Sequence, residues 1–137
     1  MSGASLLVMR AFYCLNIAGA GRSGLQLLLG DQKAAQDSWG APVTPHTAAV
    51  AVGSMWTAVA FVSIAGLAAP VTFSPLLLFQ AVYKSIFLLS STLPALRRRQ
   101  QADRPALTMG AIFAPYVLVL PFFLPWDHLL GSLQRLA

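Results

Sequence analysis

Lys84 has the clearest potential for chemistry in this sequence, because it lies inside a long apolar run. The run covers residues 75–96, and at 1.5 Å per residue Lys84 lies roughly 13 Å from its start. That depth is near the middle of a hydrocarbon core about 30 Å thick, where a charged side chain must face other helices and find a partner. The chain contains no glutamate, and none of its aspartates falls in an apolar run. Lys84 therefore has no carboxylate partner at its own depth.

Further polar side chains are expected at a similar depth, and with Lys84 they form a predicted midplane polar layer. The layer consists of Asn16, Thr57, Gln80, Lys84 and Tyr116. It can be a hydrogen-bond network that holds helices in register, or a site for a ligand, an ion or a proton pathway, since charge inside a membrane often marks function. Lys84 can be neutral, or its charge can be paired in another way. The possible partners are backbone carbonyls, another subunit, or an anionic or carbonyl-bearing ligand such as a lipid or quinone.

The composition indicates that a membrane protein positions these residues. Of the 137 residues, 57% are hydrophobic and 9% are charged, whereas a soluble domain has about 25% charged residues. A soluble fold of this composition would have too little polar surface to cover itself. The net charge of +5 comes from basic residues beside apolar runs, as in topology signals, and does not predict nucleic-acid binding. We therefore expect a protein whose main partner is the lipid bilayer.

Four apolar runs are long enough to cross a bilayer, which takes about 20 residues each. We predict an all-α, four-helix transmembrane bundle, with residues 1–137 as a single integral membrane domain. The predicted helices are residues 6–24, 47–69, 75–96 and 106–124. The first run is the least apolar, and it either crosses the membrane or lies on its surface. A short C-terminal interfacial helix is expected where Leu129, Leu130, Leu133 and Leu136 are spaced along one face.

Proline and small residues indicate how the helices end and pack. Pro70 ends the second helix, and the short link to Pro75 makes the second and third helices antiparallel neighbours. Pro115 and Pro121 are expected to kink the fourth helix. Small residues recur at four-residue spacing in the second helix, which lets helix backbones approach closely in lipid. These helix-packing residues are Ala49, Gly53 and Thr57.

Basic residues near the helix ends predict the orientation of the bundle. If all four runs cross, the loops at residues 30–46 and 97–105 share one side of the membrane. That side carries Arg22, Lys33, Arg97, Arg98, Arg99 and Arg104, and the other side carries Arg10 and Arg135. We therefore expect both loops in the cytoplasm of a bacterium and both termini outside its plasma membrane. A first run that only lies on the surface would leave the N-terminus in the cytoplasm.

The arginine cluster at the end of the third helix has two interpretations. It consists of Arg97, Arg98, Arg99 and Arg104. Such clusters are the usual cytoplasmic flank of a spanning helix, which makes a topology anchor the leading interpretation. The alternative is binding of anionic lipid head groups or of an acidic partner surface.

The two histidines do not predict a haem or metal site. His46 begins the second helix and His128 follows the fourth, so an odd number of crossings places them on opposite faces of the membrane. No serine has a matching base and acid, the only cysteine is Cys14, and no acidic metal cluster occurs. We expect Cys14 to be a small core residue. The sequence thus predicts no enzyme activity, no metal, and no cofactor other than a bound lipid or quinone.

The third helix and the close of the fourth resemble small bacterial membrane proteins of the DoxX-like group. The resemblance rests on Gln80, Tyr83, Lys84, Pro94 and the pair Pro125–Trp126. It covers the last three helices better than the first and includes no catalytic signature. It implies a four-helix bundle in the plasma membrane. The group includes small subunits associated with respiratory quinone oxidoreductases, which makes an accessory role conceivable.

Three functions are compatible with these features. The leading prediction is a non-catalytic accessory or structural subunit that packs against a larger respiratory or photosynthetic-type membrane complex, or against copies of itself. The second is an oligomeric small transporter or channel, although four-helix multidrug pumps rely on a membrane glutamate that this chain lacks. The third is a lipid- or quinone-binding protein that uses the midplane layer around Lys84.

Overall fold

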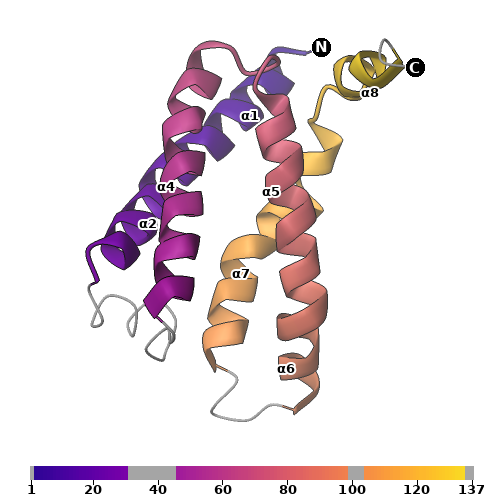
Figure 1. The fold of residues 1–137 in the computed structure, drawn as a ribbon. Helices are drawn as coiled ribbons and strands as arrows, with labels where there is room; N and C mark the ends of the chain where they lie inside the picture. Colours follow the sequence, from indigo (N-terminus) through magenta and orange to yellow (C-terminus); the bar gives the residue numbers. More distant parts are fainter. Residues whose placement is uncertain (1, 31–45, 99–103, 135–137) are drawn as a thin grey trace.

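The computed structural model describes residues 2–30, 46–98 and 104–134, and every regular element in these ranges is a helix (Figure 1). The predictions for Lys33, Arg99, Arg135 and Leu136 fall on residues outside the described ranges. Four helices in these ranges are long and apolar enough to cross a membrane. The predicted all-α architecture with four long apolar helices is therefore confirmed.

Several of the long helices are built from consecutive segments. The first consists of α1 (Gly3–Leu15), the π-helical η1 (Asn16–Ala20) and α2 (Gly21–Leu28), and the second is α4 (His46–Ala68). The third consists of α5 (Ser74–Phe87), the π-helical η2 (Leu88–Thr92) and α6 (Leu93–Arg98). The fourth is α7 (Arg104–Leu118) with the 3₁₀ turn η4 (Leu120–Phe122), and the short helix α8 (Trp126–Gln134) follows.

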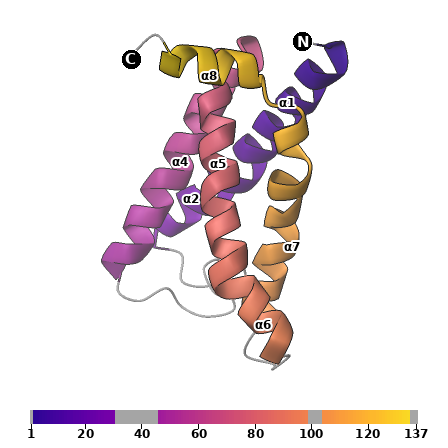
Figure 2. The same ribbon diagram turned by 90° about the vertical axis from the view of Figure 1, so that its right-hand side faces the viewer.

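The four long helices alternate in direction and form two hairpins. Both views show α2 beside α4, and α5 and α6 beside α7 (Figures 1 and 2), and α1 also contacts α4. The start of α1 and the helix α8 lie at one end of the bundle (Figure 1). The end of α2, the start of α4, the end of α6 and the start of α7 lie at the opposite end. We call these the terminal end and the loop end.

The first helix is longer than the predicted range of residues 6–24. It runs from Gly3 to Leu28, because the polar residues after Gly21 occupy one side of an amphipathic turn while Gly24 and Leu27 are buried. The sequence left open whether this segment only lies on the surface. In the structure it packs lengthwise against α4 as part of the bundle.

Glycine contacts bring the first helix very close to α4. A Cβ atom on Gly24 would lie 2.7 Å from Thr57 Oγ1, and one on Gly53 would lie 2.9 Å from the Gly24 carbonyl oxygen. Ala49 is also buried and packs with Leu27. The small residues predicted for helix packing thus lie at this crossing, where only glycine leaves room for the opposite backbone.

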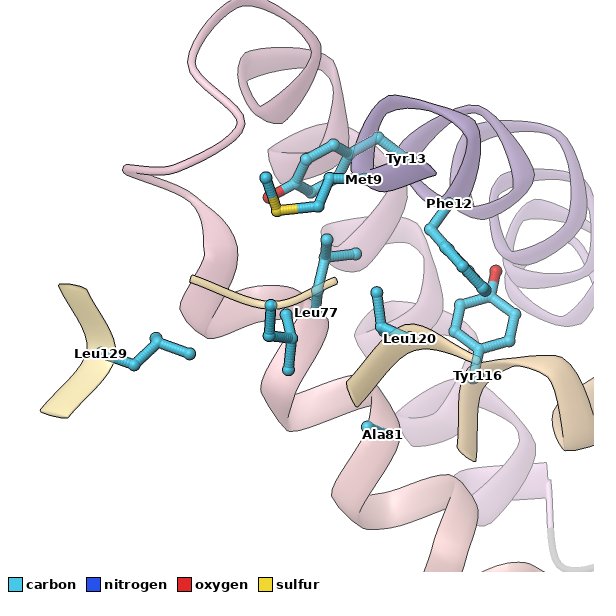
Figure 3. Close-up of a cluster of buried hydrophobic side chains, with 9 residues drawn as sticks. Met9, Phe12, Tyr13, Leu77, Ala81, Tyr116, Leu120 and Leu129 are labelled. Carbon is cyan, nitrogen blue, oxygen red and sulfur yellow. The ribbon is translucent and has the colours of Figure 1, made fainter. Parts of the chain in front are cut away.

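The terminal end is closed by a hydrophobic cluster to which every long helix except α4 contributes buried side chains (Figure 3). It joins Met9, Phe12 and Tyr13 of α1 to residues of the third and fourth helices, and it includes Leu129 of α8. Leu129 is 6% exposed, whereas its neighbour Leu130 is 54% exposed. Leu129 therefore packs against the bundle while Leu130 does not, because α8 folds across the end of the bundle (Figure 2).

Proline shortens the α-helical part of the fourth helix relative to the predicted range of residues 106–124. The α-helix begins at Arg104, continues through Pro115 and ends at Leu118, followed by the 3₁₀ turn with Pro121. Proline has no N–H to continue the α-helical ladder. The Trp126 indole nitrogen donates to the Pro121 carbonyl at 2.8 Å, which fixes the connection to α8.

Large apolar side chains are exposed on the outside of the bundle, and several polar side chains are buried inside it. Asn16 and Gln80 are at most 1% exposed, whereas Phe61 and Leu89 are at least 67% exposed. Cys14 is also exposed, so the expectation that it is a core residue is wrong. An apolar exterior around polar interior side chains is the distribution expected when hydrocarbon is the solvent.

Candidate functional site

A cleft of about 770 Å³ lies between the first helix and α7. The η1 and α2 segments form one wall, α7 forms the other, and side chains of α4 and α5 form the floor. The lining residues on the first helix are Leu15, Asn16, Ala18, Gly19, Ala20, Arg22, Ser23 and Gln26. Those on the other helices are Trp56, Tyr83, Lys84, Thr108, Met109, Ile112, Phe113, Pro115 and Tyr116. The volume falls within the range of roughly 300–1,000 Å³ typical of small-molecule sites.

Lys84 lies at the floor of this cleft and is 4% exposed. Its amine donates hydrogen bonds to Gln80 Oε1 and, at 2.8 Å, to the Tyr83 hydroxyl. The first partner follows from local geometry, because Gln80 precedes Lys84 by one helical turn. In the part of the chain that the structure describes, no carboxylate forms an ion pair with Lys84. Its hydrogen-bond partners there are neutral oxygens.

Three aromatic rings surround the Lys84 amine. The Nζ atom lies 3.9 Å from the centroid of the Tyr116 ring, 4.5 Å from that of Tyr83 and 5.0 Å from that of Phe113. Ring faces attract a cation at such distances. The aromatic side chains therefore compensate in part for the missing carboxylate, and they also give the cleft a largely aromatic floor.

Asn16 links three of the four long helices beside this floor. Its amide nitrogen donates to Ser63 Oγ at 3.1 Å, and its amide oxygen accepts from the Tyr116 hydroxyl at 2.9 Å. Ser63 in turn donates to the Val59 carbonyl at 2.7 Å. Since the Tyr116 ring also contacts Lys84, a continuous path of polar and ring contacts joins α4, η1, α7 and α5.

The structure brings together four residues of the predicted midplane layer and leaves out the fifth. Asn16, Gln80, Lys84 and Tyr116 belong to the path just described. Thr57 packs against Gly24, and its Oγ1 atom has no hydrogen-bond partner among the described residues. Ser63 takes the place expected for Thr57. Residues at the same distance along two helices meet only when the helix axes are parallel. The first helix is inclined to α4 (Figure 1).

The aromatic lining was not predicted as part of a site. The sequence pattern connects Tyr83 only with the family resemblance, and it does not distinguish Trp56 or Phe113 from packing residues. Trp56 is 6% exposed and lines the cleft together with Tyr83. The rings of Tyr83 and Phe113 adjoin Lys84 in the structure, and of these two contacts only that of Tyr83 is indicated by its position next to Lys84 in the sequence.

The wall of the cleft includes the π-helical segment η1. The Gly21 amide donates to the Asn16 carbonyl five residues earlier, and such π-helical turns often occur at functional sites. The segment is composed of small residues after Ile17. A Cβ atom on Gly19 would have no heavy atom within 4 Å, so this part of the wall leaves space beside the cleft.

The remaining predicted site residues lie away from the cleft. Arg97, Arg98 and Arg104 are exposed at the loop end, and Arg99 lies outside the described residues. His46 begins α4 at the loop end, whereas His128 lies in α8 at the terminal end (Figure 1). No group of three or more metal-binding side chains occurs within the described ranges. The absence of a haem or metal remains a prediction.

A second hollow of about 520 Å³ lies between the third helix and α7. Its lining is leucine, alanine, glycine and a single threonine, Thr92. The Thr92 hydroxyl already donates to the Ala106 carbonyl at 3.1 Å. This hollow therefore offers no free polar group to recognise a ligand, in contrast to the cleft above Lys84.

Comparisons with protein-family models, with curated proteins and with solved structures found no match. The similarity to DoxX-like proteins therefore remains a prediction from the residues named above, and the cleft is the feature that bears on function.

Proposed function

We propose that this chain is an integral membrane protein that binds a membrane-dissolved, oxygen-bearing molecule in the cleft above Lys84. The observation that carries the proposal is that a buried lysine with no carboxylate partner in the described residues lines a cavity of about 770 Å³ at mid-helix. Intramembrane charge of this kind is a functional feature by default. Apolar pockets with a few convergent polar groups are typical ligand sites.

Membrane insertion is supported by the exterior of the bundle. Four helices have the length and apolar composition to cross a bilayer, and large side chains such as Phe61, Leu118 and Ile112 are more than half exposed. In water these side chains would favour aggregation. The excess of basic residues on the segments at the loop end favours a bacterial plasma membrane orientation with that end in the cytoplasm and both termini outside.

The cleft favours ligand binding over a purely structural network. A network that only holds helices in register needs its polar groups to meet one another and gains nothing from adjacent empty space. Lys84 has three N–H donors, and its hydrogen-bond acceptors within the described residues are Gln80 and Tyr83. A third donor therefore remains for an oxygen atom of a ligand in the cleft, such as a lipid or quinone.

The lining favours binding without catalysis. The described lining residues include no carboxylate, imidazole or thiol, so tyrosine hydroxyls are the acid–base groups that they offer beside Lys84. The accessory-subunit function predicted from the sequence, and the transporter alternative, remain predictions. A subunit that binds a ligand within a larger membrane complex would agree with both the accessory-subunit prediction and the present proposal.

The proposal is tested by identifying what co-purifies with the protein. We expect mass spectrometry of organic extracts from the protein purified in mild detergent to contain one enriched amphiphile in roughly equimolar amount. Gly19→Leu should remove it, because Gly19 lines the cleft and a larger side chain there has room to take up part of the cleft. Gly3→Leu is the matched control, since a Cβ atom at Gly3 is equally free of contacts and Gly3 does not line the cleft. Equal lipid content in both variants and the wild type would contradict the proposal.

A further inference from the structure

The charged side chains of the cleft indicate the charge of its ligand, if the binding function proposed above is correct. Among the described residues, the cleft is lined by two charged side chains, Arg22 and Lys84, and both are basic. None of the described lining residues is a carboxylate that would balance them. In surroundings of low dielectric constant, charges interact much more strongly than in water, so two unbalanced cations favour an anion over a neutral molecule.

The two basic residues lie at different depths along the cleft. Arg22 follows Asn16 by six residues on the first helix, which places it roughly 9 Å closer to the loop end. Ser23, Gln26 and Thr108 line the cleft at that same shallow level. Their hydroxyl and amide groups can donate hydrogen bonds. The shallow level thus combines a positive charge with several donors, as expected of an entry site for a polar head group.

Between the two polar levels the walls are small or apolar. Ala18, Gly19 and Ala20 form this part of one wall, and Ile112 and Phe113 form the other. Such walls accommodate a hydrocarbon chain without competing for its head group. A ligand with one anionic group and one apolar chain would match both features of the cleft.

We infer that the ligand is an anionic amphiphile, whose carboxylate or phosphate pairs with Lys84 while its apolar chain lies along the cleft and reaches the lipid. Arg22 attracts the same anionic group at the shallow level. The aromatic rings of Tyr83, Phe113 and Tyr116 partly stabilise the Lys84 amine in the free protein, and the anion completes its pairing on binding. Carboxylate and phosphate share this chemistry, and they correspond to a free fatty acid and to a phosphate-bearing single-chain lipid.

The inference is tested with brominated probes in phosphatidylcholine vesicles that contain the protein. Bromine quenches tryptophan fluorescence at short range, and Trp56 lines the cleft; Trp56→Phe identifies its share of the signal. The probes are dibromostearic acid, the corresponding dibromostearyl alcohol and a lysophosphatidic acid with the same chain. We expect saturable quenching by the acid at a concentration roughly ten- to a hundredfold lower than by the alcohol, the range given by one charged hydrogen-bonded contact. The phosphate probe shows whether phosphate is bound more tightly than carboxylate.

Substitutions at the two basic residues separate charge recognition from binding itself. Lys84→Met should remove the preference for the acid and leave quenching by the alcohol. Arg22→Gln, at an exposed position, should weaken binding of the acid severalfold and provides the test if Lys84→Met does not fold. Equal affinity for acid and alcohol in the wild type would overturn the inference and leave the proposed binding function intact. No saturable quenching by any probe would overturn both.

Discussion

The Tyr116 hydroxyl donates a hydrogen bond to Asn16 Oδ1 at 2.9 Å, across the end of the cleft that the two residues line. The two residues are 100 positions apart in the chain. The Tyr116 ring also lies 4.7 Å from the Phe12 ring, centroid to centroid. The Tyr116–Asn16 hydrogen bond therefore lies between the terminal half of the bundle, which the hydrophobic cluster fills, and the half that contains the cleft.

Removal of the Tyr116 hydroxyl should loosen this contact without emptying the core. Tyr116→Phe keeps the ring over Lys84 but leaves the side-chain oxygen Oδ1 of Asn16 without its donor. We expect a loss of about 1 kcal/mol in the free energy of unfolding, since hydrogen bonds between membrane helices contribute about 0.6 kcal/mol on average and an unsatisfied buried group adds to the cost. Unfolding by sodium dodecyl sulfate in mixed micelles measures the change, and an unchanged midpoint would show that this bond does not hold the helices.

Close packing of the first helix on α4 predicts that Gly24→Ala is strongly destabilising. The added methyl group would lie 2.7 Å from Thr57 Oγ1 and 2.8 Å from the Thr57 backbone nitrogen, so the two backbones must separate. Overpacking of this kind costs about 1–3 kcal/mol. Gly19→Ala in the same helix is the control, because its methyl group meets nothing within 4 Å. The same detergent unfolding assay compares the two variants, and equal stability would contradict a close crossing of these two helices at Gly24.

Cys14 provides a built-in probe of membrane insertion. It is the chain's only cysteine, it is exposed on the first helix, and it lies roughly 16 Å along that helix from Gly3. A fluorophore attached to Cys14 in detergent, before reconstitution, should be quenched by lipids that carry a nitroxide near the chain end. Iodide in the water should have little effect. Strong iodide quenching would mean that this surface faces water.

The predicted orientation can be tested by cysteine accessibility in intact cells. In a Cys14→Ser background, a cysteine at Gln100 should resist membrane-impermeant thiol reagents added from outside, and a cysteine at Ser2 should react. The reason is the excess of basic residues beside the helix ends that share a side with Gln100. Labelling at position 100 from the outside would reverse the assignment, and labelling at neither position would place the N-terminus in the cytoplasm as well.

The four helices could be predicted because each is long, apolar and bounded by polar or proline residues. The depth of Lys84 along its apolar run could also be read from the sequence, and the same arithmetic selected Asn16, Gln80 and Tyr116. Each of these predictions depends on distance along a single helix, which a sequence specifies directly.

The rest of the site depends on how helices lie relative to one another. Asn16 meets Ser63 and not Thr57 because the first helix is inclined to α4. Glycine contacts at the α2–α4 crossing set this inclination. The cleft exists because the η1 and α2 segments pack on α4 and leave space beside α7. The π-helical turn at Asn16 has no distinctive composition, and the burial of Leu129 follows from the direction of α8.

Magnetic resonance of the Lys84 side chain tests most directly whether a ligand occupies the cleft. The chain contains two lysines, so Lys33→Arg leaves Lys84 as the source of the single signal from ¹⁵Nζ-labelled lysine. With the protein in phosphatidylcholine nanodiscs, we predict that addition of dibromostearic acid shifts this signal saturably, and that Gly19→Leu abolishes the shift. An unchanged Lys84 signal at concentrations that saturate Trp56 quenching would contradict binding at Lys84.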